Sequence, residues 1–168
     1  MPTKAMLASS EALWSMRNPH ELGLDGCDPW LDGARVMRRV QDIVRTLRRT
    51  TEQKLDGIDN LDRITGRGRL ADARTVVVET DDGERTLSGN NLVVATGARP
   101  NRPGFIPDLP GVMTSDDAVA MERLPESVVV IGAGPIGCEF STFFAEMGVK
   151  VVLVEKLDRC LGQMDTEA

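Results

Sequence analysis

Residues 126–155, ESVVVIGAGPIGCEFSTFFAEMGVKVVLVE, decide the fold class of this chain. The β-branched run at 128–131 predicts a strand, and the glycine-rich turn GAGPIG at 132–137 follows it directly. A helical segment comes next, and a second apolar run at 149–154 ends on Glu155. A strand, a glycine turn, a helix, a second strand and a terminal acid together make the dinucleotide-binding fingerprint in its required context.

The glycines of this turn predict a phosphate-binding loop. Gly132 permits the tight turn, Gly134 lets the backbone approach a pyrophosphate, and Gly137 lets the helix pack closely on the strand. The helix N-terminus offers free N–H groups and a positive dipole end to phosphates, and Pro135 costs little in a first turn. The predicted cofactor-binding residues of the turn are Gly132, Ala133, Gly134, Pro135, Ile136 and Gly137.

Glu155 predicts which nucleotide the turn binds. It lies about 20 residues after the turn, where an acid accepts a hydrogen bond from the adenosine ribose. A carboxylate at this place repels a 2′-phosphate, so NAD is favoured over NADP. The turn alone separates NAD from FAD poorly, because both cofactors use it. A βαβ unit that binds no nucleotide stays as the alternative.

Composition and charge argue against several classes of function. The chain has 168 residues and a net charge of −6, which argues against nucleic-acid binding. No apolar run approaches the ~18 residues of a membrane helix, and no signal-peptide pattern opens the chain, so we expect a cytoplasmic protein without a membrane partner. Three cysteines without metal spacing and one histidine, His20, support neither a metal site nor a triad mechanism.

The first half of the chain predicts two helices and several short strands. The helices are expected at 4–17 and 34–55, and the second is amphipathic with an arginine-rich outer face that we interpret as a solvated surface. The strands are expected at 61–65, 75–80 and 84–87, the last two forming a hairpin.

Two further segments lead into the fingerprint. The apolar run at 92–95 predicts a buried parallel strand, and the tight turn Thr96-Gly97-Ala98 is expected to end it. A short helix is expected at 114–124, capped by Ser115 or Asp116.

This order of features resembles the flavoprotein disulfide reductases over essentially the whole chain. The segment at 92–100 looks like the end of the family's FAD domain, and the segment at 114–118 looks like the entry to its NAD domain. The opening residues resemble the segment that follows the family's redox-active disulfide. The segments that carry the resemblance are MPTK at 1–4, GRG at 66–68, LVVATGARP at 92–100, TSDDA at 114–118, GAGPIGCEF at 132–140, and 160–167 with Asp165.

The resemblance implies an α/β fold with parts of two Rossmann-like FAD- and NAD(P)-binding domains and a small antiparallel β meander. Residues 1–112 are then the C-terminal part of the FAD-binding domain, and residues 113–168 are the N-terminal part of the NAD(P)-binding domain. The implied cofactors are FAD and NAD. Lys4 and Glu139 are implied as an auxiliary ion pair near the flavin ring. The other residues implied on the flavin side are Gly68, Thr96, Gly97 and Ala98.

By the same resemblance, the function is that of an FAD-dependent NAD(P)H oxidoreductase, similar to dihydrolipoyl dehydrogenase, acting on a small-molecule or lipoyl-type disulfide. Mercuric reductase or the soluble pyridine nucleotide transhydrogenase is the alternative within the family. Pro135 stands where some members, such as glutathione reductase, have a tyrosine.

The chain departs from the family in what it does not contain. It has no first FAD glycine turn, no redox cysteine pair and no C-terminal dimerisation domain with its acid/base histidine. We therefore expect an internal fragment that folds poorly, is inactive alone and does not form the family's homodimer. A truncated, non-catalytic gene product is the alternative from another class. A one-domain NAD dehydrogenase is disfavoured, because too few residues follow Glu155 to complete a nucleotide-binding sheet.

Overall fold

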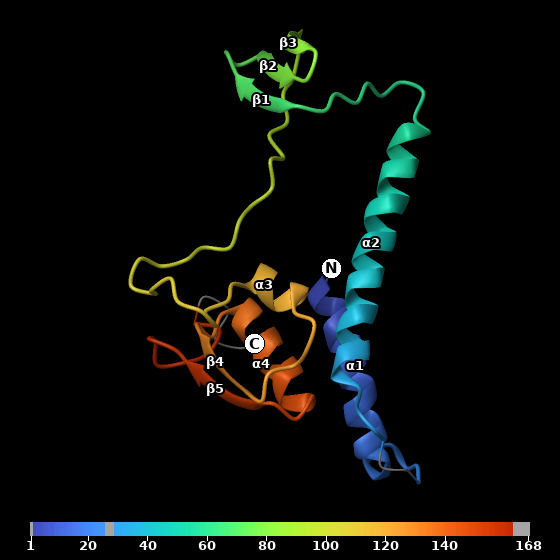
Figure 1. The fold of residues 1–168 in the computed structure, drawn as a ribbon, viewed down its shortest axis with the longest axis vertical. Coiled ribbons are helices and arrows are strands. Elements are labelled where there is room, and N and C mark those ends of the chain that lie inside the picture. The colour runs from blue at the N-terminus through green and yellow to red at the C-terminus, as the bar shows by residue number, and fades with distance from the viewer. Residues whose placement is uncertain (1, 26–28, 163–168) are drawn as a thin grey trace. The chain divides into compact units, whose positions relative to one another are not determined.

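The structure is a computed structural model that describes residues 2–25 and 29–162. Met1, Cys27 and Asp165 therefore lie outside the described residues. The chain forms two compact units, Met1–Arg48 with Pro100–Ala168, and Arg49–Arg99. The elements labelled in Figure 1 are α1 (Pro2–Arg17), α2 (Gly33–Asp56), β1 (Arg67–Leu70), β2 (Thr75–Thr80), β3 (Gly83–Ser88), α3 (Ser115–Ala120), β4 (Ser127–Ile131), α4 (Pro135–Glu146) and β5 (Lys150–Val154), and a 3-10 turn, η1, spans Pro19–Leu22.

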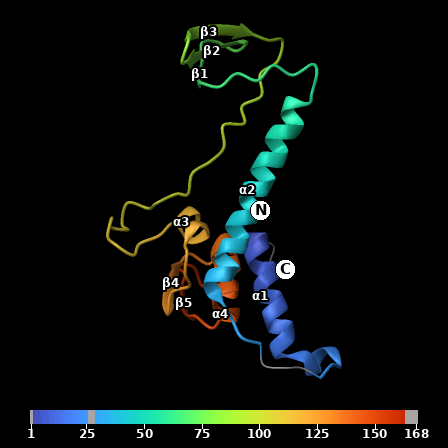
Figure 2. The ribbon, with the colours of Figure 1, turned by 45° about the vertical axis from the view of Figure 1, so that its right-hand side comes forward.

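The first unit contains the predicted βαβ fingerprint. Strands β4 and β5 pair in parallel, in a register that runs from Ser127 opposite Lys150 to Ile131 opposite Val154. Helix α4 makes the crossover and lies against one face of the two strands (Figures 1 and 2). Gly148, with φ of 80°, turns the chain from α4 into β5, because a glycine adopts this left-handed conformation without steric cost. The strand–turn–helix–strand prediction is confirmed.

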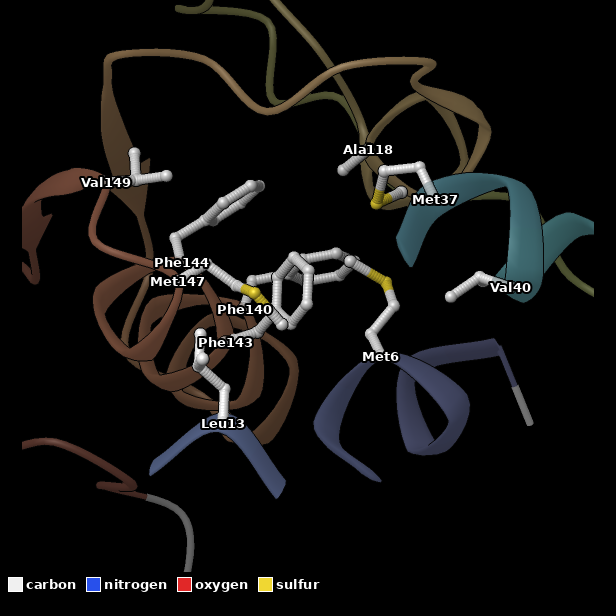
Figure 3. Close-up of a cluster of buried hydrophobic side chains, with 10 residues drawn as sticks. All are labelled: Met6, Leu13, Met37, Val40, Ala118, Phe140, Phe143, Phe144, Met147 and Val149. Atoms are coloured by element: carbon white, nitrogen blue, oxygen red, sulfur yellow. The ribbon is translucent and has the colours of Figure 1, made fainter. Parts of the chain in front are cut away.

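A cluster of buried apolar side chains joins α4 to the N-terminal helices. Phe140, Phe143 and Phe144 follow one another at the spacing of a single helix face, and all three are buried. Figure 3 shows the Phe140 and Phe143 rings beside the Met6 side chain of α1, in a cluster that also contains Phe144 and Met37 of α2. The whole buried cluster comprises Met6, Leu13, Met37, Val40, Ala118, Phe140, Phe143, Phe144, Met147 and Val149.

A polar contact supports the packing of α1 on α2. Arg39, on the arginine-rich face of α2, donates to the Ala5 carbonyl oxygen at 3.1 Å and to the Ser9 hydroxyl at 3.0 Å. This arginine thus serves a structural purpose within the first unit.

The face of β4 and β5 turned away from α4 is open. Burial alternates along both strands, with Val128 and Val151 packed against the core. The residues between and beyond them, Val129, Ile131, Val152 and Val154, are exposed to between 47% and 60%. Parallel strands are usually covered on both faces by helices or loops. In the first unit, therefore, α4 covers one face of a two-stranded Rossmann-like sheet and the other face is exposed.

The second unit contains an antiparallel meander in the order β1-β2-β3. Its second and third strands match the hairpin predicted at 75–80 and 84–87, with Thr80 opposite Gly83 at the turn. The strand predicted at 61–65 is wrong. These residues form no strand, and the strand that pairs with β2 is β1, which begins at Arg67. The backbone at Gly66 passes so close to the Glu79 carbonyl that a Cβ there would clash with it. The backbone of Gly66 thus lies against β2 directly before the β1–β2 ladder, which starts at Arg67.

Two other predictions are corrected. Residues 92–95 form no strand, and Val93 and Val94 are 89% and 67% exposed. An apolar run becomes a strand only when a neighbouring strand satisfies its backbone groups, and no described strand pairs with this one. The tight turn expected at 96–98 is also absent from the described structure, although Gly97 has φ of 79°.

The helix expected at 114–124 is shorter, and its cap is different. It spans Ser115–Ala120 as α3, and Thr114 caps it in place of Ser115 or Asp116. Asp117 accepts from the Thr114 backbone N–H at 2.8 Å, and the Thr114 hydroxyl accepts from the Asp117 N–H at 3.4 Å. This reciprocal capping box satisfies two backbone donors and sets the start of the helix.

We expect the open sheet face to bind hydrophobic dye without contributing to stability. The double variant Val129→Thr with Val152→Thr should lower the fluorescence of bound ANS, because it removes exposed apolar surface while keeping β-branched side chains. Its urea unfolding midpoint should be unchanged. The matched variant Val128→Thr with Val151→Thr should lower the free energy of unfolding by about 1–3 kcal/mol per site, because it places hydroxyls against the core. Equal effects of the two variants on unfolding would contradict the assignment of the faces.

Candidate dinucleotide-binding site

The glycine turn is held between the two strands and the start of α4. Gly132 has φ of 103°, and its N–H donates to the Val154 carbonyl oxygen at 2.8 Å, which ties the end of β4 to the end of β5. Gly137 lies so close to the Gly132 carbonyl that a Cβ there would overlap it. Both glycines are therefore required by the fold itself.

Gly134 differs from its neighbours, because the fold does not require a glycine there. Its φ of −74° and ψ of −179° are ordinary for any residue, and a Cβ on it would meet nothing within 4 Å. It is the N-cap of α4, and no side chain caps the helix. The turn thus has open space beside the backbone where a side chain would fit.

The first turn of α4 presents unpaired donors to this space. Pro135 has no N–H to satisfy, and the first hydrogen bond joins the Cys138 N–H to the Gly134 carbonyl at 2.9 Å. Within the described residues, the N–H groups of Ile136 and Gly137 have no hydrogen-bond partner. Unpaired N–H groups and the positive end of the helix dipole attract anions.

Glu155 closes the site from the end of β5. Its Oε2 accepts from the Ala133 N–H at 2.7 Å, and its Oε1 accepts from the Lys156 and Leu157 N–H groups at 2.7 and 2.9 Å. These hydrogen bonds, from Leu157 first and then from Ala133, hold the pKa of Glu155 below its usual value. The carboxylate is therefore charged at neutral pH and is fixed against the glycine turn.

The structure does not form the ion pair expected between Lys4 and Glu139. Lys4 lies exposed on α1, and Glu139 lies half-buried on α4, the helix against which α1 packs. The five ion pairs of the described residues include neither side chain. The interface between these helices is made by Met6, Leu13 and the phenylalanine rings, and it requires no contact between the two charges.

The remaining flavin-side residues lie in the second unit. Gly68 is in strand β1 opposite Val78. A Cβ at Gly68 would make only an ordinary contact with Val76, which leaves Gly66 as the glycine that the meander requires. Thr96, Gly97 and Ala98 are exposed in a segment without regular secondary structure. Within the first unit, the structure gathers the glycine turn and Glu155 into one place.

Sequence reasoning missed two features of this region. Glycine is required at Gly66, because the backbone of β2 passes too close for a side chain there. Cys138 and the loop that carries Cys160 come together at the Ala133 carbonyl oxygen, although the spacing of the two cysteines in the sequence fits no motif. Only the βαβ topology, which returns the chain to the start of α4 after β5, could have indicated this proximity.

The described residues contain no group of three or more His, Cys, Asp or Glu side chains able to hold a metal ion. Among the same residues, no helix is both long enough and apolar enough to cross a membrane.

The pKa of Glu155 gives the site a pH dependence. Because backbone hydrogen bonds lower this pKa below its usual 4.5, the carboxylate contributes stability above the unfolded-state pKa, and that contribution is lost as the pH falls through the lower, folded-state pKa. We expect the backbone amide protons of Ala133 and Leu157 to titrate together, with an NMR midpoint below 4.5. Glu155→Gln should abolish this titration. A shared midpoint at or above 4.5 would contradict the assignment.

Known structures share this fold. The HOCl-induced flavoprotein disulfide reductase RclA from Escherichia coli matches with a TM-score of 0.78 and 25% identity, over 99% of this chain and 34% of that one. A dihydrolipoyl dehydrogenase of Chlorobaculum parvum is 34% identical over 99% of this chain, and one of Bacillus subtilis is 33% identical over the same share. A soluble pyridine nucleotide transhydrogenase of Mycobacterium tuberculosis is 42% identical over 65% of this chain.

The chain spans 36% and 37% of the length of these two dehydrogenases. The family described as pyridine nucleotide-disulphide oxidoreductase matches residues 1–168. The predicted α/β class and the resemblance to flavoprotein disulfide reductases are thereby confirmed. This chain belongs to the pyridine nucleotide-disulphide oxidoreductase family.

Proposed function

We propose that this chain carries the nucleotide-binding turn of an FAD-dependent NAD(H) oxidoreductase of the dihydrolipoyl dehydrogenase type. The observation that carries the proposal is the open space at Gly134, where the backbone conformation and the surroundings would both accept a side chain. A glycine kept free of a side chain beside unpaired N–H groups suits the close approach of a pyrophosphate. The names of the dehydrogenase relatives support the type of enzyme.

Glu155 is the residue that selects NAD in this proposal. Three backbone N–H groups hold its carboxylate, and Oε2, which accepts only one of these hydrogen bonds, keeps capacity to accept another from a ribose hydroxyl. Its charge repels the 2′-phosphate of NADP. The nicotinamide would supply hydride to the flavin when both cofactors are bound, while this chain's residues hold and orient the adenosine half.

On the flavin side, we propose Lys4, Gly68, Thr96, Gly97, Ala98 and Glu139 as FAD-contacting residues. The division into an FAD part at 1–112 and an NAD(P) part at 113–168 belongs to the same proposal. The substrate would be a small-molecule or lipoyl-type disulfide. The full-length enzyme would be a cytoplasmic homodimer, a dimer that is not expected from this chain by itself. The 42% identity to the transhydrogenase favours one second candidate, hydride exchange between nicotinamide nucleotides without a disulfide substrate.

The role of Gly134 is tested by NADH binding to the purified chain, followed by nucleotide fluorescence. We expect Gly134→Ala to weaken NADH binding at least tenfold (~1.4 kcal/mol), because the new Cβ occupies the space for the pyrophosphate. The matched control is Gly104→Ala, another site where a Cβ meets nothing within 4 Å. Both variants should unfold at the wild-type midpoint. Unchanged NADH affinity in Gly134→Ala would overturn the proposal.

The role of Glu155 is tested with the same assay. The unmodified chain should bind NADH at least tenfold more tightly than NADPH, and Glu155→Ala should narrow that difference by about 1–3 kcal/mol, because it removes both the ribose acceptor and the repulsion. Preference of the unmodified chain for NADPH would show that Glu155 does not select the nucleotide.

A further inference from the structure

Cys138 and the loop that carries Cys160 meet at one carbonyl oxygen of the glycine turn. Cys138, in the first turn of α4, donates its thiol to the Ala133 carbonyl oxygen at 3.4 Å. The backbone N–H of Leu161, the residue after Cys160, donates to the same oxygen at 2.7 Å. The loop after β5 is therefore folded back onto the turn, and it brings Cys160 to the start of α4.

The two thiols influence each other. Burial raises the pKa of the Cys138 thiol, and the neighbouring Cys160 raises this pKa further. Both cysteines are reduced in the structure. Cys138 is half-buried, whereas Cys160 is exposed, so the pair has one sheltered and one accessible sulfur.

The loop that carries Cys160 is closely folded. Leu161 adopts φ of 54°, which is uncommon for a residue with a side chain. Arg159 donates to the Gly162 carbonyl oxygen at 3.1 Å, across the two residues between them. Together with the hydrogen bond from Leu161 to Ala133, these contacts hold the Cys160 loop beside the turn.

We propose that Cys138 and Cys160 form a redox-active dithiol that closes to a disulfide between the first turn of α4 and the loop after β5. The oxidant is a hydroperoxide. The exposed Cys160 thiolate attacks the peroxide, giving a sulfenic acid on Cys160 and, with hydrogen peroxide, one water. The Cys138 thiol then attacks that sulfur, the S–S bond forms, and the hydroxyl leaves as a second water. Two thiols are oxidised and one peroxide is reduced.

The disulfide would join the two borders of the glycine turn. One border is the first turn of α4, and the other is the loop that begins at Glu155 and returns to Ala133 through Leu161. The formation of the disulfide does not depend on nucleotide binding, so its test stands apart from the test of the proposed function.

The experiment uses the full chain with Cys27→Ser, which leaves only the two thiols of interest. After treatment with a slight excess of hydrogen peroxide, free thiols are alkylated and the intact mass is measured. We expect loss of both thiols, a mass lower by two hydrogen atoms, a monomer on a non-reducing gel and full recovery with dithiothreitol. Peptide mapping should link the peptides that contain residues 138 and 160.

Matched variants separate this proposal from general oxidation. In the same background, Cys138→Ser and Cys160→Ser should each leave one thiol that gains oxygen or forms intermolecular dimers. The parent chain in about 8 M urea should form the internal disulfide at least tenfold more slowly, because the fold no longer brings the sulfurs together. Two thiols that stay free, oxygen addition to each sulfur separately, dimers alone, or equal rates in urea would each overturn the proposal.

Discussion

The close approach of Gly137 to the Gly132 carbonyl is the constraint on which the first unit depends. With no Cβ at Gly137, the first turn of α4 can lie directly against the end of β4. That position directs Phe140, Phe143 and Phe144 into the core shared with α1 and α2. It also leaves the N–H groups of the first turn beside the open backbone at Gly134. One missing methyl group therefore determines both the packing and the candidate site.

Glu155 extends this arrangement from packing to recognition. The hydrogen bond from Ala133 ties the end of β5 to the turn, and it does so with a charged, half-buried side chain. The same carboxylate thus stabilises the turn and keeps capacity on Oε2 for a further hydrogen bond from a ribose hydroxyl. The loop that follows Glu155 returns to the turn, where the Leu161 N–H donates to the Ala133 carbonyl oxygen. Ala133 is therefore held through both its backbone groups, its N–H by Glu155 and its carbonyl by Leu161.

The fingerprint could be predicted from sequence because its contacts are local: the turn, the helix and the second strand follow one another without interruption. The hairpin of β2 and β3 was predictable for the same reason. The run at 92–95 was not, because a strand needs neighbours, and its apolar residues alone cannot supply a ladder. Whether Lys4 reaches Glu139 depends on how α1 packs on α4, and the proximity of Cys160 to Cys138 depends on how the last loop packs there. No local sequence pattern contains this information.

The central claim is that the open backbone at Gly134 and the unpaired donors beside it bind the pyrophosphate of a nucleotide. Titration of the isotope-labelled chain with ADP-ribose, followed by backbone amide NMR, tests this claim most directly. The account predicts saturable shifts centred on the amides of Ile136 and Gly137, with Ala133 following as Glu155 engages the ribose. Saturable shifts confined to other parts of the chain, or no shifts at millimolar ADP-ribose, would contradict it.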